Sequence, residues 1–316
     1  SSTCCPLFNW DMNLETTYWM IYGANRLDLG KPLLRWLFSP SLVAQLRDNV
    51  VEPTHRIDSL AAPPTLSGFM GVANPQPEPP NYIGNLLWTL VNVWSHYRHS
   101  GDAAILPDLA VLLRGAVAHH GYFLVEDANA TLHLPPINSP EYDAIFHWPG
   151  QGDTTYELAL YRWGLNTLLQ VCGLVTDLCS ESDVSHWNHV LSHLAPFPTN
   201  KHRPIGEGAG LYVADGLPFN LSHRHFSHLI PCFTTGLIDW DETDDGSLCT
   251  LSLDNWAALP DQWDTFSFAA ASAMSARAHR PHATPPPSHA SLIPPPPLLH
   301  ATSPLAHVSF SPLRCA

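Results

Sequence analysis

Apolar residues recur every three or four positions along most of the first 278 residues, and this spacing most constrains the fold. The clearest case is the segment from Gly84 to His99, where one face collects apolar side chains: Leu86, Leu87, Leu90, Val91, Trp94 and Tyr97. This period is typical of an amphipathic α-helix. Similar segments lie at about 10–28, 32–50, 103–120, 153–171, 183–195, 226–238, 247–258 and 263–277. The sequence therefore predicts an all-α array of helical hairpins, with the long loops collected at one end.

Proline-rich loops and one predicted hairpin interrupt the helical pattern. The span from Pro53 to about Pro80 also contains Pro63, Pro64, Pro75, Pro77 and Pro79, which predicts a loop without regular structure. The segments 123–127 and 130–134 are rich in β-forming residues and flank Ala128 and Asn129, which predicts a short β-hairpin. A second loop, rich in Pro, Gly and aromatic residues, extends from Pro135 to Gly152.

The composition divides the chain at about residue 278. Residues 1–278 hold the helical pattern, and a chain of 316 residues with 45% hydrophobic content can bury a large core. Residues 279–316 contain the runs 285–287 and 294–297 of consecutive prolines and almost no acidic residue. We expect this segment to be a disordered Pro-rich tail. We consider two interpretations of residues 279–316: a Pro-rich recognition tail, or a non-native ending of the chain.

Charge and composition exclude several classes of partner. The 14 Lys and Arg residues against 28 Asp and Glu residues give a formal net charge of −14, which repels phosphate backbones, so we expect no nucleic-acid partner. No apolar run reaches eighteen residues, so we expect no membrane span. The 11 Trp and 9 Tyr residues favour an uncharged ligand such as a sugar, whose apolar face stacks on flat rings, although large helical cores are also rich in aromatic residues.

Cysteines and glycosylation signals are the sequence features that relate to the cellular compartment of the protein. Seven cysteines are too few for a disulfide scaffold, but Cys172 with Cys179 and Cys232 with Cys249 are candidate pairs. Sequons begin at Asn129 and at Asn220, which is compatible with a secreted glycoprotein. The chain begins with neither an initiator methionine nor a signal peptide, so we expect a fragment or a processed product.

The heptapeptide 223–229, with the sequence HRHFSHL, is the densest cluster of polar chemistry. Imidazoles both donate and accept hydrogen bonds, so three of them beside a guanidinium suit a polar cavity that orients sugar hydroxyls or carboxylates. The alternative is a helix N-terminus with one structural histidine. A zinc site is a third hypothesis, but His223, His225 and His228 lack the spacing of a helical ligand pair, and no Cys or Glu completes a ligand set. We therefore predict no metal site.

Two carboxylates are candidates for acid and base chemistry. Hydrolysis of a glycosidic bond needs one carboxyl that donates a proton to the leaving oxygen and a second that activates water or attacks the sugar. Glu141 follows Pro140 in an aromatic loop, which predicts a desolvated acid that keeps its proton. Asp261 is predicted at the start of a helix, where the helix dipole favours the ionised form that a base needs. A solvated loop acid and an ordinary helix cap are the respective alternatives.

Other catalytic patterns are incomplete in this sequence. No G-x-S-x-G motif of a serine hydrolase is present. The glycine-rich run 206–210 lacks the last glycine and the preceding strand of a dinucleotide-binding loop. The acidic segment 241–246 resembles the start of a calcium loop, but Ser252 occupies the position of the required Glu.

Four segments together resemble the catalytic domain of glycoside hydrolase family 95, the α-L-fucosidase and α-L-galactosidase group. The helix entry of that family, N-x-N-x-Q-x-N-Y-W, corresponds to residues 11–19, and its S-P-E acid loop matches 139–141. Its H-R-H-x-S-H-L motif matches 223–229, and its acidic residue at the opening of a late helix corresponds to Asp261. The resemblance covers about residues 8–278, and the H-R-H-x-S-H-L motif is its most specific element.

This resemblance implies an (α/α)6 barrel and the inverting hydrolysis of a terminal α-L-fucoside or a similar sugar. Glu141 is implied as the general acid and Asp261 as the general base, with the water oriented through Asp11 and Asn13. Inversion places two such carboxyls roughly 6.5–9.5 Å apart so that the water fits between them. One of the histidines His223 and His225 is implied to contact sugar hydroxyls. The expected partner is an oligosaccharide or polysaccharide, and no cofactor is implied.

The sequence also departs from the family pattern. Asp11 replaces an amide of the family, so a second carboxylate would lie near Asp261 and share the role of base. Asn9 stands where the family often has His. The amino-terminal β-sandwich, the last barrel helices and the carboxy-terminal β-domain of the family have no counterpart, so we expect an incomplete barrel with exposed apolar faces. A phosphorylase or lyase on the same barrel, and a non-catalytic or degenerate carbohydrate-binding protein, are the rival hypotheses.

Overall fold

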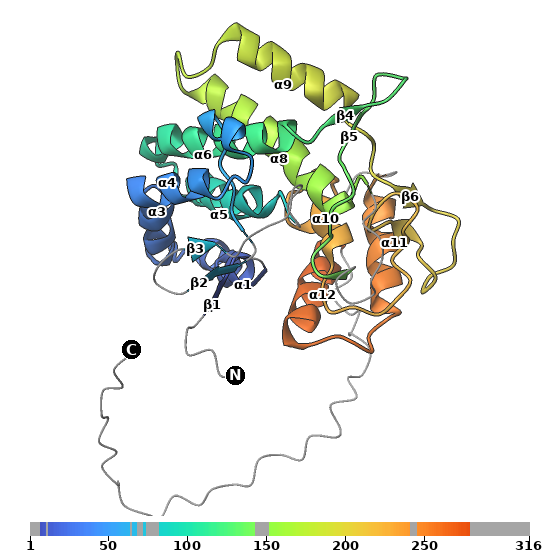
Figure 1. The fold of residues 1–316 in the computed structure, drawn as a ribbon. Coiled ribbons are helices and arrows are strands. Elements are labelled where there is room, and N and C mark those ends of the chain that lie inside the picture. The colour runs from blue at the N-terminus through green and yellow to red at the C-terminus, as the bar shows by residue number, and fades with distance from the viewer. Residues whose placement is uncertain are drawn as a thin grey trace, which may run out of the picture.

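The computed structural model describes residues 7–10, 12–63, 65–67, 72–73, 82–142, 152–240 and 245–278. Helices make up most of these residues, and the strands form one three-stranded and two two-stranded sheets (Figure 1). The predicted all-α class is therefore confirmed for the described part of the chain. The Pro-rich tail 279–316 lies outside the described residues. Within the described residues, no helix has the length and apolar character needed to cross a bilayer.

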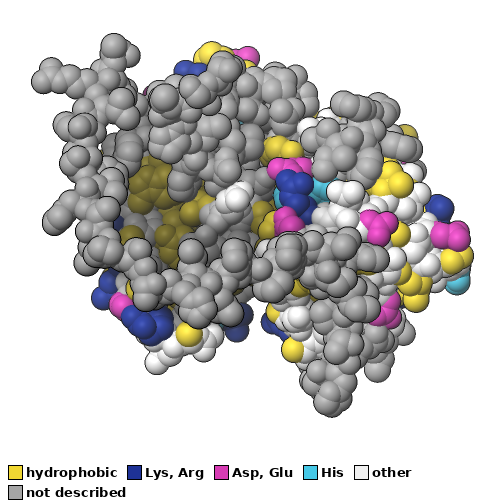
Figure 2. Space-filling model, turned by 90° about the horizontal axis from the view of Figure 1, so that it is seen from below, with side chains coloured by type: hydrophobic (Ala, Val, Ile, Leu, Met, Phe, Trp, Pro, Cys, Tyr) yellow, Lys and Arg dark blue, Asp and Glu magenta, His cyan; other side chains and the backbone are white. Residues whose placement is uncertain are grey.

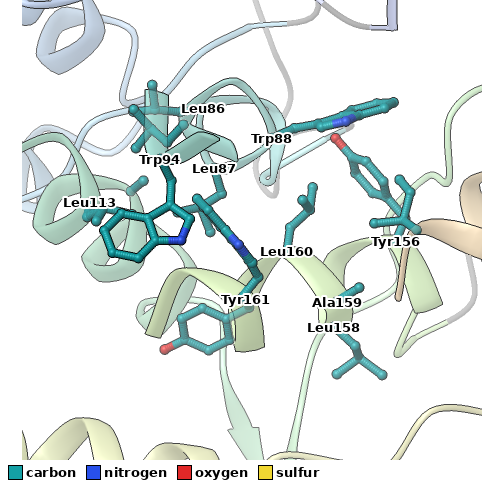
Figure 3. Close-up of a cluster of buried hydrophobic side chains, with 14 of the residues drawn as sticks. Leu86, Leu87, Trp88, Trp94, Leu113, Tyr156, Leu158, Ala159, Leu160 and Tyr161 are labelled. Atoms are coloured by element: carbon teal, nitrogen blue, oxygen red, sulfur yellow. The ribbon is translucent and has the colours of Figure 1, made fainter. Parts of the chain in front are cut away.

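Three long helices build the centre of the molecule: α5 (Asn85–Ser100), α6 (Leu106–Gly121) and α8 (Thr155–Leu174). They pack against one another, and their large apolar side chains interdigitate in the core (Figure 3). Leu87 and Leu113 are fully buried, as are Tyr156 and Leu160 of α8. The helix α5 ends at Gly101, whose φ of 69° is a left-handed C-cap that favours glycine. The sequence predicted these helices within a few residues.

The two amino-terminal helical predictions each correspond to two shorter helices. Residues 10–28 form α1 (Met12–Thr17) and α2 (Trp19–Gly23), and a 3₁₀ turn, η1 (Leu27–Gly30), follows. Residues 32–50 form α3 (Lys31–Leu37) and α4 (Pro40–Asp48). The second break has a local cause, because Pro40 opens a helix and Ser39 caps it by accepting a hydrogen bond from the Leu42 N–H at 3.3 Å.

The prediction that the span 53–80 contains no regular structure was wrong. Residues Pro53–Ile57 form a 3₁₀ helix, η2, and the strands β2 (Thr65–Ser67) and β3 (Val72–Ala73) pair with β1 (Leu7–Asn9). The sheet is antiparallel in the order β1-β2-β3, with Phe8 opposite Leu66. Proline excludes helix interiors, but both strands lie between Pro64 and Pro75, in a stretch that contains no proline. The predicted hairpin is confirmed as β4 (Val125–Glu126) and β5 (Leu132–His133).

The described part of the second half of the chain adds four α-helices and a long irregular segment. The helix α9 (Glu181–His193) follows α8, and the strands β6 (Thr199–Asn200) and β7 (Gly210–Leu211) pair after it. The helices α11 (Asp245–Ala257) and α12 (Thr265–Arg277) complete the described fold, and η4 (Ala103–Ile105) precedes α6. The helix predicted at 226–238 is much shorter, because only η5 (Ser227–Leu229) and α10 (Ile230–Phe233) form.

Two disulfides join neighbouring elements, and both are pairs that the sequence offered as candidates. Cys172 near the end of α8 is bonded to Cys179, and Cys232 of α10 is bonded to Cys249 of α11. The second disulfide fixes α11 against the segment that carries the HRHFSHL motif. Cys232 and Cys249 are both fully buried.

The glycine-rich run 206–210 is a structural clamp around one buried amide. The Asn255 Oδ1 accepts hydrogen bonds from the backbone N–H groups of Gly206, Gly208 and Ala209, at 2.8, 3.0 and 3.0 Å. Its Nδ2 donates to the Phe219 carbonyl at 2.7 Å. Gly210 has a φ of 90° and packs against Ser252 so closely that a Cβ would clash with it. The run therefore serves to seat the loop on α11.

Replacing Asn255 by Ala is expected to lower the free energy of unfolding by about 3 kcal/mol, because buried backbone groups lose their only partner. Urea unfolding measures the change. The matched control is Asn188→Ala on the exposed side of α9, where the Nδ2 bonds only to the Val184 carbonyl. An Asn255 variant as stable as the control would contradict the clamp.

Candidate active site

The loop that carries Glu141 is fixed on both sides of that residue. On one side, the Ser139 hydroxyl donates to the Ser227 hydroxyl at 2.7 Å, and both groups are buried. On the other side, the Tyr142 hydroxyl accepts from the Leu221 N–H at 3.1 Å, and its ring packs against Phe219. Both anchors belong to the segment around the HRHFSHL motif. The two sequence motifs that lie 82 positions apart in the chain therefore meet in space, as the resemblance predicted.

Glu141, Arg224 and Asp264 form a charge cluster at the surface. The Arg224 Nη2 contacts the Glu141 Oε2, and the Arg224 Nε lies 3.8 Å from the Asp264 Oδ2. The side chains are 34%, 36% and 45% exposed in the order Glu141, Arg224, Asp264, so the cluster is open to solvent. Figure 2 shows a group of basic atoms on this face with acidic atoms on two sides and histidine beside it. The structure thus differs from the predicted desolvated setting of Glu141.

His223 and His225 are buried behind this cluster and are held neutral. Burial, followed by the neighbouring Arg224 charge, lowers the pKa of His223 to about 4. Burial, followed by the charges of His223 and Arg224, lowers the pKa of His225 to about 3. The His223 Nδ1 accepts from the His225 N–H at 3.1 Å, so its proton must reside on Nε2. Among the described residues that Nε2 has no hydrogen-bond partner, which leaves one buried donor available.

His225 is the histidine of the motif that faces the candidate acid. Its Nε2 is 3.8 Å from the Glu141 Oε2, and its ring contacts Phe266 of α12 at 5.4 Å between centroids. The third histidine, His228, points elsewhere: it is fully buried and stacks on Phe219 at 4.2 Å. The motif therefore divides into two histidines at the site and one in the core.

The sequence predicted Asp261 at the start of a helix, but in the structure it does not lie in the first turn of a helix. It is exposed in the turn that precedes α12, and the N-cap of that helix is Asp264. Hydrogen bonds through one side chain hold the turn against the HRHFSHL segment. The Ser222 hydroxyl donates to the Leu259 carbonyl at 2.7 Å and accepts from the Gln262 N–H at 2.8 Å. The turn with Asp261 is thus anchored next to His223.

The remaining predicted residues lie on or before α1. Asn13 is exposed in the first turn of α1, and Asp11 lies outside the described residues. The helix itself is anchored by the buried carboxylate of Glu15, which accepts from the Thr89 hydroxyl at 2.5 Å and from the Asn92 Nδ2 at 3.0 Å. No contact between Asn13 and the Glu141 cluster is found among the described residues.

A cavity of about 1080 Å³ lies between α2, α5, α10 and α12. Aromatic rings line it, among them Trp19, Trp94, Trp163, Phe226 and Phe266. Phe266 of this lining also contacts the ring of His225, at 5.4 Å between centroids. Flat rings beside polar groups suit an uncharged, partly apolar ligand. In the described part of the chain, no three His, Cys, Asp or Glu side chains are grouped so as to hold a metal ion.

Sequence reasoning missed two residues of the cluster. Arg224 was recognised as part of the motif but was given no role, and Asp264 was not singled out. The spacing Asp264-x-x-Ser267 is that of a capping box, which is the signal that locates the start of α12 at Asp264. An ion pair between Arg224 and two carboxylates has no comparable signature in the sequence.

Comparison with known proteins gives a family match. Residues 6–284 match the family model described as the glycosyl hydrolase family 95 catalytic domain. No curated protein matches the chain.

The buried histidines are expected to make the fold less stable in acid. The pKa values of His119, His225 and His228 are lowered to about 3 by burial, and that of His223 to about 4. The unfolded chain takes up these protons near pH 6.5, whereas the folded chain does not. The stabilisation is therefore complete above pH 6.5 and is lost as the pH falls towards 4, by about 1.4 kcal/mol per histidine and pH unit.

Urea unfolding at pH 7.5 and pH 5.5 tests this. His228→Leu removes one such group and is expected to reduce the difference between the two pH values by about 1 kcal/mol. The control is His202→Leu, which changes an exposed histidine. Equal pH dependence in the wild type and the His228 variant would refute the explanation.

Proposed function

Because the chain belongs to glycosyl hydrolase family 95, we propose that it hydrolyses a terminal α-L-fucoside or a similar sugar with inversion of configuration. The family makes it a glycoside hydrolase with a carbohydrate substrate. The observation that carries the finer proposal is the position of Glu141. Its carboxyl is partly exposed, is fixed by anchors on both sides, and faces the Arg224 and His225 side chains of the HRHFSHL motif. In the proposal Glu141 is the general acid that protonates the leaving oxygen.

Asp261 is proposed as the general base. Its turn is held beside His223 by the two hydrogen bonds of Ser222, and its carboxyl is exposed to the water that it would activate. The other nearby carboxylate, Asp264, is engaged twice: it caps α12 by accepting from the Ser267 backbone N–H, and its Oδ2 faces Arg224. A carboxylate that caps a helix and pairs with a guanidinium is less available for proton transfer, which supports Asp261.

Sugar contacts are assigned to the two buried histidines. A neutral imidazole with one free N–H is suited to donate to a hydroxyl, and the Nε2 of His223 is such a donor. His225 lies between Glu141 and the aromatic Phe266, where it would orient the sugar against the acid. Asp11 and Asn13 remain part of the proposal as the groups that orient the water.

The finer statements on architecture and compartment also belong to the proposal. Antiparallel neighbours such as α5–α6 and α8–α9 support an (α/α)6 barrel. Two disulfides support an oxidising compartment, and we propose a secreted protein. Both sequon residues, Asn129 and Asn220, are exposed, as glycosylation requires.

A panel of aryl glycosides tests the activity, with proton NMR of the anomer that forms first. The α-L-fucoside is expected to be cleaved with inversion. Glu141→Gln and Asp261→Asn are each expected to lower kcat by about 10²–10⁴-fold, because each removes one proton-transfer group. A second arm measures the rate with and without inorganic phosphate.

The control is Asp28→Asn, which neutralises an exposed carboxylate in a surface ion pair with Arg26. Product of retained configuration, or full activity in either active-site variant, would overturn the proposed mechanism. A rate that requires phosphate would instead indicate a phosphorylase. Sugar binding without any turnover, unchanged by Glu141→Gln, would indicate a non-catalytic protein.

A further inference from the structure

The guanidinium of Arg224 is shared between two carboxylates that come from different parts of the chain. Its Nη2 contacts the Oε2 of Glu141, which ends the acid loop, and its Nε lies 3.8 Å from the Oδ2 of Asp264, which begins α12. The two carboxylates contact different nitrogen atoms of one cation, so they share its charge. The proposed reaction employs Glu141 alone and gives neither of the other two residues a task.

The backbone of Arg224 is fixed, while its charged end is not enclosed. The Arg224 carbonyl accepts from the Ser267 hydroxyl at 2.7 Å, and the same hydroxyl accepts from the Asp264 N–H at 3.2 Å. Arg224 and Asp264 are therefore tied to one serine in the first turn of α12. The guanidinium is 36% exposed, which leaves room for a small displacement towards either carboxylate.

The contact with Glu141 opposes the task of a general acid. A guanidinium beside a carboxyl stabilises the ionised form, whereas a general acid has to carry a proton before the bond breaks. The conflict is reduced if another anion competes for the guanidinium. Asp264 is placed to compete, because its Oδ2 lies 3.8 Å from the Arg224 Nε while Glu141 contacts the Nη2.

We propose that Arg224 is a positioning residue, and that competition between Glu141 and Asp264 for its guanidinium sets the pH at which Glu141 keeps its proton. This inference rests on the proposed role of Glu141 as the general acid. When Glu141 is protonated, Arg224 keeps its pair with Asp264 and stays in the site. When Glu141 has given its proton to the leaving group, Arg224 stabilises the new carboxylate.

The other titratable group that faces Glu141 among the described residues is His225, at 3.8 Å. Its pKa, lowered to about 3 mainly by burial, makes it neutral throughout the working range of a glycosidase. His223 is neutral as well, because its pKa is lowered to about 4. The positive charge next to Glu141 in the described part of the chain is therefore that of Arg224.

Two substitutions are expected to move the alkaline limb of the kcat/KM profile in opposite directions. Arg224→Met removes the cation that favours the ionised Glu141, so the limb moves up by about one pH unit. Asp264→Asn removes the competitor and leaves Arg224 to Glu141, so the limb moves down. Asn caps helices as well as Asp does, so the start of α12 is preserved. At a pH above the wild-type limb, a shift of one unit changes the rate about tenfold in either direction.

Matched controls come from an exposed ion pair elsewhere. Arg26→Met and Asp28→Asn make the same charge changes in a pair whose side chains are 59% and 60% exposed, and they are expected to leave the limb in place. Arg224→Lys keeps the charge but not the two-sided contact, so its limb is expected to lie between those of the wild type and Arg224→Met. Thermal unfolding checks that each variant is folded.

A second readout separates this inference from the proposed activity. Carbon-13 NMR of labelled glutamate, with Glu141→Gln for assignment, follows the protonation of Glu141 directly and needs no turnover. Opposite displacements of its midpoint in Arg224→Met and Asp264→Asn support the inference, even if no glycoside is cleaved and the proposed function fails. Turnover with unmoved or parallel midpoints overturns the inference and leaves the proposed function standing.

Discussion

The site depends on how three different elements bind the backbone and hydroxyl groups of the HRHFSHL segment. Trp256 of α11 donates its Nε1–H to the His223 carbonyl at 3.1 Å, and Ser267 of α12 donates to the Arg224 carbonyl at 2.7 Å. From the acid loop, Ser139 reaches the Ser227 hydroxyl at 2.7 Å. Because residues 223–226 of the segment lie in no helix or strand, these bonds replace a helix or a strand as their support. Each of these three hydrogen bonds also holds one element (α11, α12 or the acid loop) against the HRHFSHL segment.

This support explains how the buried histidines are accommodated. Burial disfavours a charged imidazole, and the structure keeps His223, His225 and His228 neutral by enclosing them among aromatic rings. A neutral imidazole costs less to bury than an ion but still leaves donors and acceptors to satisfy. In His228 the stacking on Phe219 serves the core, whereas the Nε2 of His223 has no hydrogen-bond partner among the described residues and belongs to the proposed site. Similar residues in one motif thus carry different functions.

Sequence patterns predicted those parts of the fold that depend on local chemistry. The period of α5, the hairpin β4–β5 and the two disulfide pairs were predicted and are confirmed. The break before Pro40 was missed although its cause is local, and the sheet β1-β2-β3 was missed because strand pairing between residues 7–9 and 65–67 is set by contacts distant in sequence. The meeting of Glu141 with the HRHFSHL segment followed from the family resemblance alone. Neither the sequence patterns nor the family resemblance predicted the ion pairs of Arg224. Charge pairing across 83 positions leaves no periodic pattern in the sequence.

Asp261 and Asp264 near α12 show how an ion pair can distinguish a structural carboxylate from a candidate base. Asp261 and Asp264 are three positions apart and, by composition, either suits a helix cap or a base. The capping interaction with Ser267 and the pair with Arg224 both engage Asp264, so its carboxylate is committed to holding α12 and the HRHFSHL segment together. Asp261 lies in a turn fixed by Ser222 and presents its carboxyl to solvent, where a water molecule can reach it. The capping box and the ion pair therefore commit Asp264 to the structure of the site, whereas Asp261 is exposed and is the carboxylate that we propose as the base.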